Sequence, residues 1–222
     1  MAYFTSESFA FLRELSKNNN REWFAANKKR YEAELRDPAL RFISDFGPRL
    51  NRIAPRLVAD PRPVGGSMFR IYRDTRFSRD KSPYKTHLGI HFFHEKAKAA
   101  ASVPGFYLHI SPEQNFAAAG IWHPDAQSLA KIRAAVANGS SDWKAIKKSK
   151  VPIEGGSLKR PPRGFAADHP MVEDLKRTDF VTSVPLSEKE ICSNKFMADF
   201  AADCRKMTPL VRFVARSLKL PW

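Results

Sequence analysis

Four segments in the middle of the chain alternate apolar and polar side chains, and this alternation restricts the possible folds more than any other feature. The segments are residues 68–73, 87–94, 105–111 and 115–122, each bounded by glycine, proline or polar turns. A period of two indicates strands with one buried face and one open face. Residues 180–185 are a candidate for one more strand, and residues 96–102 predict a mobile connection.

Helical patterns precede and follow these strands. Apolar side chains recur every three or four residues in six segments, at 9–15, 23–35, 43–53, 129–136, 191–204 and 210–218. Asn19 with Glu22 approximates a capping box for the second helix. The dipeptide Gly47-Pro48 predicts a kink or a break in its helix, and Thr208-Pro209 predicts the restart of a last helix.

Helices first, strands in the middle and helices last favour an α+β fold over an alternating α/β fold. We expect a central antiparallel sheet of four to five strands, flanked by N-terminal and C-terminal helices. The 222 residues are 43% hydrophobic and include 17 phenylalanines, which is enough apolar material for a core and excludes a disordered basic tail. We therefore predict a single domain over residues 1–222.

The cellular setting follows from what the sequence lacks. No stretch approaches the roughly 18 apolar residues that a membrane-spanning helix needs, and residues 1–7 show no signal-peptide pattern. Cys192 and Cys204 are too few for a disulfide framework or a cysteine-based zinc site. We expect a cytoplasmic protein without a membrane partner, either a monomer or a weak homodimer.

The positive charge is concentrated in one part of the chain. The formal net charge is +15, and residues 61–100 hold nine basic and three acidic side chains, a net of +6. Most of this excess lies between Arg70 and His87, which suggests a site rather than a uniformly basic surface.

Residues 70–87 contain arginines at every third position, followed by two lysines. Arginine matches phosphate and carboxylate groups with two hydrogen bonds at once, and lysine adds a point charge. The candidate ligand-binding residues are Arg70, Tyr72, Arg73, Arg76, Arg79, Lys81 and Lys85. The alternative is structural: Asp74 and Asp80 pair with the arginines and fix the loop.

The alternation also predicts which side chains share the open face of the sheet. If Phe69 and Ile71 face the core, then Arg70 and Tyr72 turn the other way. The same argument applied to the next two strands completes a face made of Arg70, Tyr72, His87, His91, Tyr107 and His109. The candidate catalytic residues on it are His87, His91, His109 and Tyr107, which can take up or donate protons. A half-exposed sheet with an ordinary polar face is the simpler interpretation.

The neighbouring histidines raise the question of a metal site. His87 and His91 on one straight strand would lie about 13 Å apart, too far to share one zinc ion. A cross-strand pair of His91 with His109 lacks an obvious third ligand. We therefore expect no metal and no cofactor.

The sequence resembles a known family in several motifs. The most specific is FRIYRDTRFSRDKSPYKTH, and others are NNNREWFAANKKRYE, GFYLHISP, GIW, LKRPPRGFAADHP and FVTSVPLS. They are similar to the family catalogued as domain of unknown function 2461, which occurs in bacteria and fungi. The resemblance runs from about Phe9 to Leu218 and implies one family domain, with no established activity or cofactor to transfer.

Three functions fit these observations. The first is a binding domain for a small anionic ligand, most simply one bearing phosphate, held by residues 70–87 and the adjoining histidine–tyrosine face. The second is an enzyme with His87 or His91 as general base and an arginine that stabilises negative charge. The third is a nucleic-acid-binding protein whose footprint extends to the basic runs at 144–150 and 159–163.

Overall fold

The strands form one antiparallel sheet. The computed structural model describes residues 2–96, 103–149 and 151–222. Within them the sheet has the strand order β1-β2-β3-β4-β5. Its strands are β1 (Leu57–Val58), β2 (Leu88–His94), β3 (Gly105–Ile110), β4 (Phe116–Ile121) and β5 (Phe180–Pro185). Each strand pairs with the next one along the chain, so the sheet is a meander, interrupted by helices only between β4 and β5.

Helices occupy both ends of the chain and the segment between β4 and β5. The N-terminal ones are α1 (Ser6–Lys17), α2 (Arg21–Ala26), α3 (Lys28–Tyr31), the π-helical turn η1 (Glu32–Arg36) and α4 (Asp37–Ile53). The others are α5 (Ala126–Ala137), α6 (Ser141–Lys148), α7 (Val172–Leu175), α8 (Glu188–Ile191) and α9 (Phe196–Ser217). This arrangement confirms the predicted α+β class.

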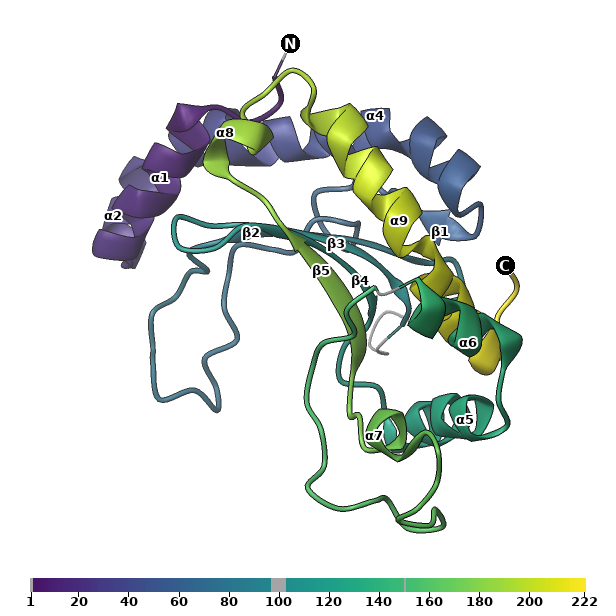
Figure 1. Cartoon of the computed structure of the whole chain (residues 1–222). Helices are drawn as coiled ribbons and strands as arrows, with labels where there is room; N and C mark the ends of the chain where they lie inside the picture. Colours follow the sequence, from purple (N-terminus) through teal and green to yellow (C-terminus); the bar gives the residue numbers. More distant parts are fainter. Residues whose placement is uncertain (1, 97–102, 150) are drawn as a thin grey trace.

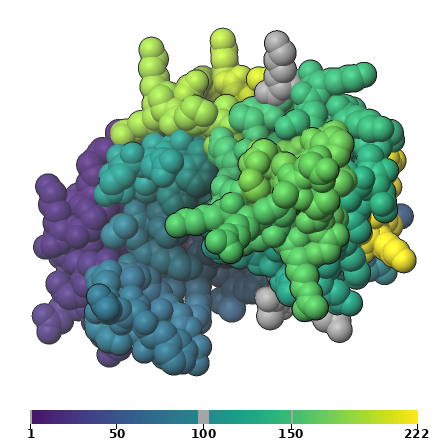
Figure 2. Space-filling model, turned by 60° about the horizontal axis from the view of Figure 1, so that its bottom comes forward, coloured from purple at the N-terminus to yellow at the C-terminus, as the bar shows by residue number. Residues whose placement is uncertain are grey.

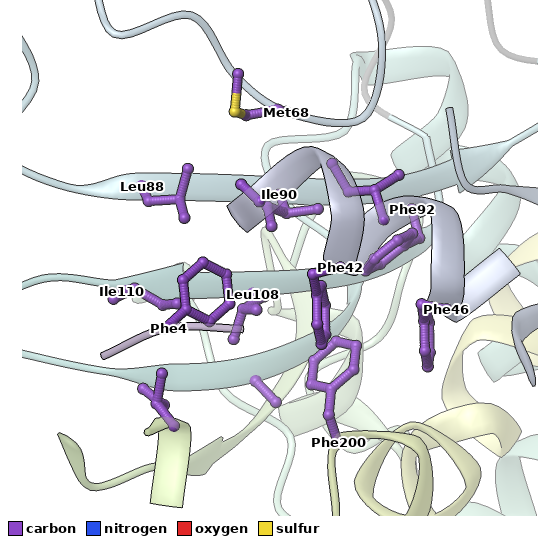
Figure 3. Close-up of a cluster of buried hydrophobic side chains, with 14 of the residues drawn as sticks. Phe4, Phe42, Phe46, Met68, Leu88, Ile90, Phe92, Leu108, Ile110 and Phe200 are labelled. Carbon is purple, nitrogen blue, oxygen red and sulfur yellow. The ribbon is translucent and has the colours of Figure 1, made fainter. Parts of the chain in front are cut away.

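One face of the sheet is covered by helices. Figure 1 shows α1, α2, α4 and α9 on the same side of β2–β5. Phe42 and Phe46 of α4 stack against each other and pack with Phe200 of α9, and Phe46 reaches Phe92 of β2. Figure 3 shows these aromatic side chains next to the inward side chains of β2 and β3. A second cluster around Trp143, Phe180 and Phe213 joins α5 and α6 to α9 and to the end of β5.

Two predicted helix breaks are wrong. Helix α4 continues through Pro48, and α9 continues through Pro209. A proline inside a helix costs about 3 kcal/mol, whereas each buried Leu, Ile or Phe contributes about 1.5–3 kcal/mol. Leu50 after the first proline and Leu210 after the second are both buried, so packing against the sheet outweighs the lost hydrogen bond.

The strand predicted at 68–73 is also wrong. The edge strand is β1, and residues 68–73 form only isolated bridges, Met68 with Ile90 and Tyr72 with Tyr84. The connection expected at 96–102 lies, apart from Lys96, outside the described residues.

Candidate functional site

The basic segment forms an arm that projects from the edge of the sheet. Two backbone hydrogen bonds tie its base to β2: His91 N–H donates to Ser67 O (2.8 Å), and Phe69 N–H donates to Gly89 O (2.9 Å). Further out, Lys85 N–H donates to Ile71 O at 2.7 Å. We call residues 70–86 the arm. It runs as an irregular hairpin on the side of the sheet away from α4 and α9 (Figure 1).

The N-terminal helices hold the arm in place. The Asn19 side chain donates from Nδ2 to Tyr84 O (2.9 Å) and accepts at Oδ1 from Tyr84 N–H (3.1 Å). The Tyr84 ring stacks on Phe24 of α2 with centroids 4.0 Å apart, and Tyr72 packs beside both rings. Two side chains far from the arm in sequence therefore fix its conformation.

The arm's arginines are partly neutralised by its own carboxylates, as the structural alternative predicts. Arg73 forms an ion pair with Asp80, and Arg76 donates to both oxygens of Asp74 at 3.0 and 2.7 Å. The hydrogen bonds from Arg76 lower the pKa of Asp74 to about 2. The side chains of Arg70 and Arg79 make no hydrogen bond or ion pair with the described part of the chain.

A pocket of about 440 Å³ lies between the arm and α1. Its polar lining combines two basic side chains with a histidine, hydroxyls and an amide. The lining residues are Ser16, Asn19, Arg73, Asp80, Ser82, Tyr84, Lys85, Thr86 and His87. Of the predicted ligand-binding and catalytic residues, Arg73, Lys85 and His87 thus come together, whereas Arg70, Tyr72, Arg76, Arg79 and Lys81 lie outside this lining. Lys81 instead donates to Thr75 O within the arm.

The four predicted catalytic side chains do share the open face of the sheet. His87 stacks on His109 with centroids 4.6 Å apart, and His109 stacks on Phe116 at 4.8 Å. The Tyr107 hydroxyl is 3.1 Å from Nδ1 of His109. His91 lies opposite Tyr107 in the register of β2 and β3.

Phe69 lies on this face, although the sequence predicted that it faces the core, and Tyr72 packs instead against Phe24 and Tyr84. The bridge between Met68 and Ile90 turns Met68 into the core. Phe69 therefore points to the opposite side, where it is 44% exposed and lies 6.0 Å from the Tyr107 ring and 6.2 Å from the His91 ring. We call Phe69, His87, His91, Tyr107, His109 and Phe116 the ring face.

Two glycines allow the rings to lie flat against the strands. A Cβ atom on Gly89 would lie 2.6 Å from the Tyr107 hydroxyl oxygen, and one on Gly105 would lie 2.6 Å from Nε2 of His91. Both distances are shorter than any van der Waals contact allows. The Tyr107 ring therefore lies over Gly89, and the His91 ring lies over Gly105.

Burial keeps the ring face uncharged at neutral pH. It lowers the pKa of His91 to about 4, and burial together with His87 lowers that of His109 to about 4. Burial, then Lys85 and Arg73, lower the pKa of His87, and burial raises that of Tyr107 to about 12. The face therefore offers neutral rings with hydrogen-bonding edges, beside a pocket that carries the charge.

A comparison with protein families finds one match over nearly the whole chain. The model of the family described as conserved hypothetical protein, DUF2461, matches residues 7–213. The chain belongs to this family. Neither a search of curated proteins nor a search of solved structures found a match.

The motifs that carry membership in the DUF2461 family take distinct places in the fold. The longest one supplies Phe69, the arm and His87, and GFYLHISP supplies β3 with Tyr107 and His109. The NNN motif supplies Asn19, which sequence reasoning assigned to a helix cap. In the structure Asn20 caps α2 by accepting from Trp23 N–H, so Asn19 is free to hold Tyr84. Because three asparagines follow one another, the sequence does not show which of them caps the helix and which binds Tyr84.

Two further observations concern metal-ligating side chains and membrane-spanning helices. Among the described residues no group of three or more His, Cys, Asp or Glu side chains is arranged to hold a metal ion. None of the helices in the described segments has both the length and the apolar character needed to cross a bilayer.

Proposed function

We propose that the protein binds a small phosphate-bearing anion in the pocket between the arm and α1. The observation that carries this proposal is the convergence of Arg73, Lys85 and His87 on one pocket whose lining also holds Asp80, four hydroxyl side chains and the Asn19 amide. Guanidinium, ammonium and hydroxyl donors together match a tetrahedral oxyanion.

The pairing of Arg73 with Asp80 orients the guanidinium toward the pocket without using all of its donors. Arginine has five N–H donors, and Asp80 accepts from Nη1 while Ser78 Oγ is 3.5 Å from Nη2. Lys85 Nζ donates to Arg70 O at 3.0 Å, which leaves two of its three donors for a ligand. Arg73 and Lys85 together exceed the charge of Asp80, so the pocket favours an anion.

Calorimetric titration with inorganic phosphate tests this proposal. We expect Arg73→Ala and Lys85→Ala each to weaken binding about tenfold or more, because each removes charge-assisted hydrogen bonds. Arg76→Ala is the matched control, since Arg76 pairs with Asp74 outside the pocket lining. Wild-type protein that binds no phosphate, or equal losses in all three variants, would contradict the proposal.

A second candidate is an enzyme that acts on a phosphate ester, with His87 as general base. The position of His87 favours it, because this ring lines the pocket and its lowered pKa keeps it neutral and able to accept a proton. His91 lies deeper in the ring face and is not among the pocket residues. Product formation during the same titrations with phosphate esters would distinguish an enzyme from a binding domain.

We also propose a cytoplasmic location and a monomeric or weakly dimeric state. The free thiols of Cys192 and Cys204 support a reducing compartment.

A further inference from the structure

The ring face and the pocket are physically continuous. His87 lines the pocket and stacks on His109, and Lys85 lines the pocket while its Nζ lies 5.4 Å from the centroid of the Phe69 ring. Figure 2 shows a hollow between the arm (blue) and the segment that follows residue 150 (green), on the side of the sheet away from the covering helices. A ligand held at Lys85 therefore has Phe69 directly beside it.

Phe69 is shaped to receive a flat group. Its ring is 44% exposed, although the rings of His91 and Tyr107 support it from the sheet side. The glycines at 89 and 105 let those supporting rings lie flat, so the surface under Phe69 is a layer of rings and not of projecting side chains.

The pocket and the ring face differ in charge, so each is suited to a different part of a ligand. The pocket end carries Arg73 and Lys85, whereas the ring face is uncharged at neutral pH. A ligand made only of phosphate would leave the exposed part of the Phe69 ring, which Lys85 Nζ approaches, without an aromatic partner. A planar heteroaromatic ring would cover the exposed part of the Phe69 ring by stacking.

We propose that the ligand carries a planar heteroaromatic ring beside its phosphate, as a purine nucleoside monophosphate does, and that Phe69 stacks on this ring. This inference rests on the proposed function, because it takes the phosphate to occupy the pocket at Arg73 and Lys85.

The test compares three probes by calorimetric titration: adenosine 5′-monophosphate, ribose 5-phosphate and inorganic phosphate. Base stacking on an aromatic side chain predicts that the nucleotide binds about tenfold or more tightly than ribose 5-phosphate. Phe69→Leu keeps an apolar side chain but removes the ring. We expect this variant to lose the preference for the nucleotide and to keep its affinity for ribose 5-phosphate.

Phe77→Leu is the control for this variant. Phe77 lies on the same arm, is 96% exposed and is not a pocket residue, so its change should leave all three affinities as they are. Equal binding of the nucleotide and ribose 5-phosphate, or a preference that survives in Phe69→Leu, would overturn the inference and leave the phosphate pocket intact. No binding of any of the three probes would overturn both proposals.

Discussion

The His91 ring illustrates how burial at a single residue sets the stability of the protein against acid. Its pKa of about 4 in the folded chain lies below the ordinary value of 6.5, because burial disfavours the charged imidazolium. The unfolded chain therefore binds a proton first as the pH falls. The contribution of neutral His91 to the free energy of unfolding is fully present above about pH 6.5, and it is lost as the pH falls from there toward 4.

We expect the free energy of unfolding to decrease between pH 6.5 and 4.5, with His91 responsible for on the order of 2 kcal/mol of that decrease. Urea unfolding at several pH values in this window measures it. His91→Gln should flatten the slope, because glutamine does not titrate. His109 contributes in the same direction, so the slope should be reduced and not abolished. A slope identical to that of the wild type would contradict the prediction.

Gly89 and Gly105 mark what sequence reasoning misses at the scale of one residue. Each occupies an ordinary open-face position in the strand pattern, and nothing in that pattern shows that a ring from the neighbouring strand crosses over it. The histidines and Tyr107 were assigned to the correct face because alternation alone decides that. Phe69 was assigned to the wrong face, because its orientation depends on the pairing of Met68 with Ile90.

At the scale of elements, the attachment of the arm to α1 and α2 determines whether the pocket exists. Asn19→Ala would remove both side-chain hydrogen bonds to the Tyr84 backbone. We expect this change to destabilise the docked arm by about 1–3 kcal/mol and to speed amide exchange at Tyr84 about tenfold or more. Hydrogen–deuterium exchange measured over residues 70–86 tests this.

Asn18→Ala is the control, because the Asn18 side chain donates only to Glu14 O within α1. This variant should leave exchange in the arm unchanged. If Asn19→Ala also leaves it unchanged, then the stacking of Tyr84 on Phe24 suffices to hold the arm, and the amide clamp is dispensable.

The element pattern was predictable wherever burial follows one period over several residues. Strands β2 to β5 lie within one to two residues of their predicted bounds, since one of their faces is buried against helices. The helix interruptions predicted at Pro48 and Pro209 were wrong, because the low helix propensity of proline is outweighed by the packing of the residues that follow, including Leu50 and Leu210. Residues 70–86 were predicted as a strand followed by a loop. Their hairpin depends on Asn19, which is 65 residues away from Tyr84 in the sequence, so local patterns do not show it.

At the scale of the whole molecule, the net charge of +15 is spread over separate surfaces. The arm and α6, which carries Lys144, Lys147 and Lys148, lie at opposite ends of the sheet in Figure 1. A nucleic-acid footprint would require a continuous basic track between them. This separation argues against a footprint that joins the arm to α6.

Salt dependence distinguishes these cases. A protein that contacts 6–10 phosphates of a duplex loses about 10³–10⁵-fold in affinity between 50 and 200 mM salt. We expect any binding of a short DNA duplex, followed by fluorescence anisotropy, to be weak and to disappear at 200 mM salt. The affinity for inorganic phosphate should change by less than about tenfold over that range. Tight duplex binding at 200 mM salt would favour the nucleic-acid function instead.

The clamp between Asn19 and Tyr84 also has a consequence for the order of folding. Strands β2, β3 and β4 pair with their neighbours along the chain, and such pairings need little loop closure. The arm reaches its final position only after the N-terminal helices have packed against the sheet. The pocket is therefore completed late, and a chain that lacks its first twenty residues would lose the Ser16 and Asn19 wall of the pocket together with the buried side chains of Phe9, Phe11 and Leu12.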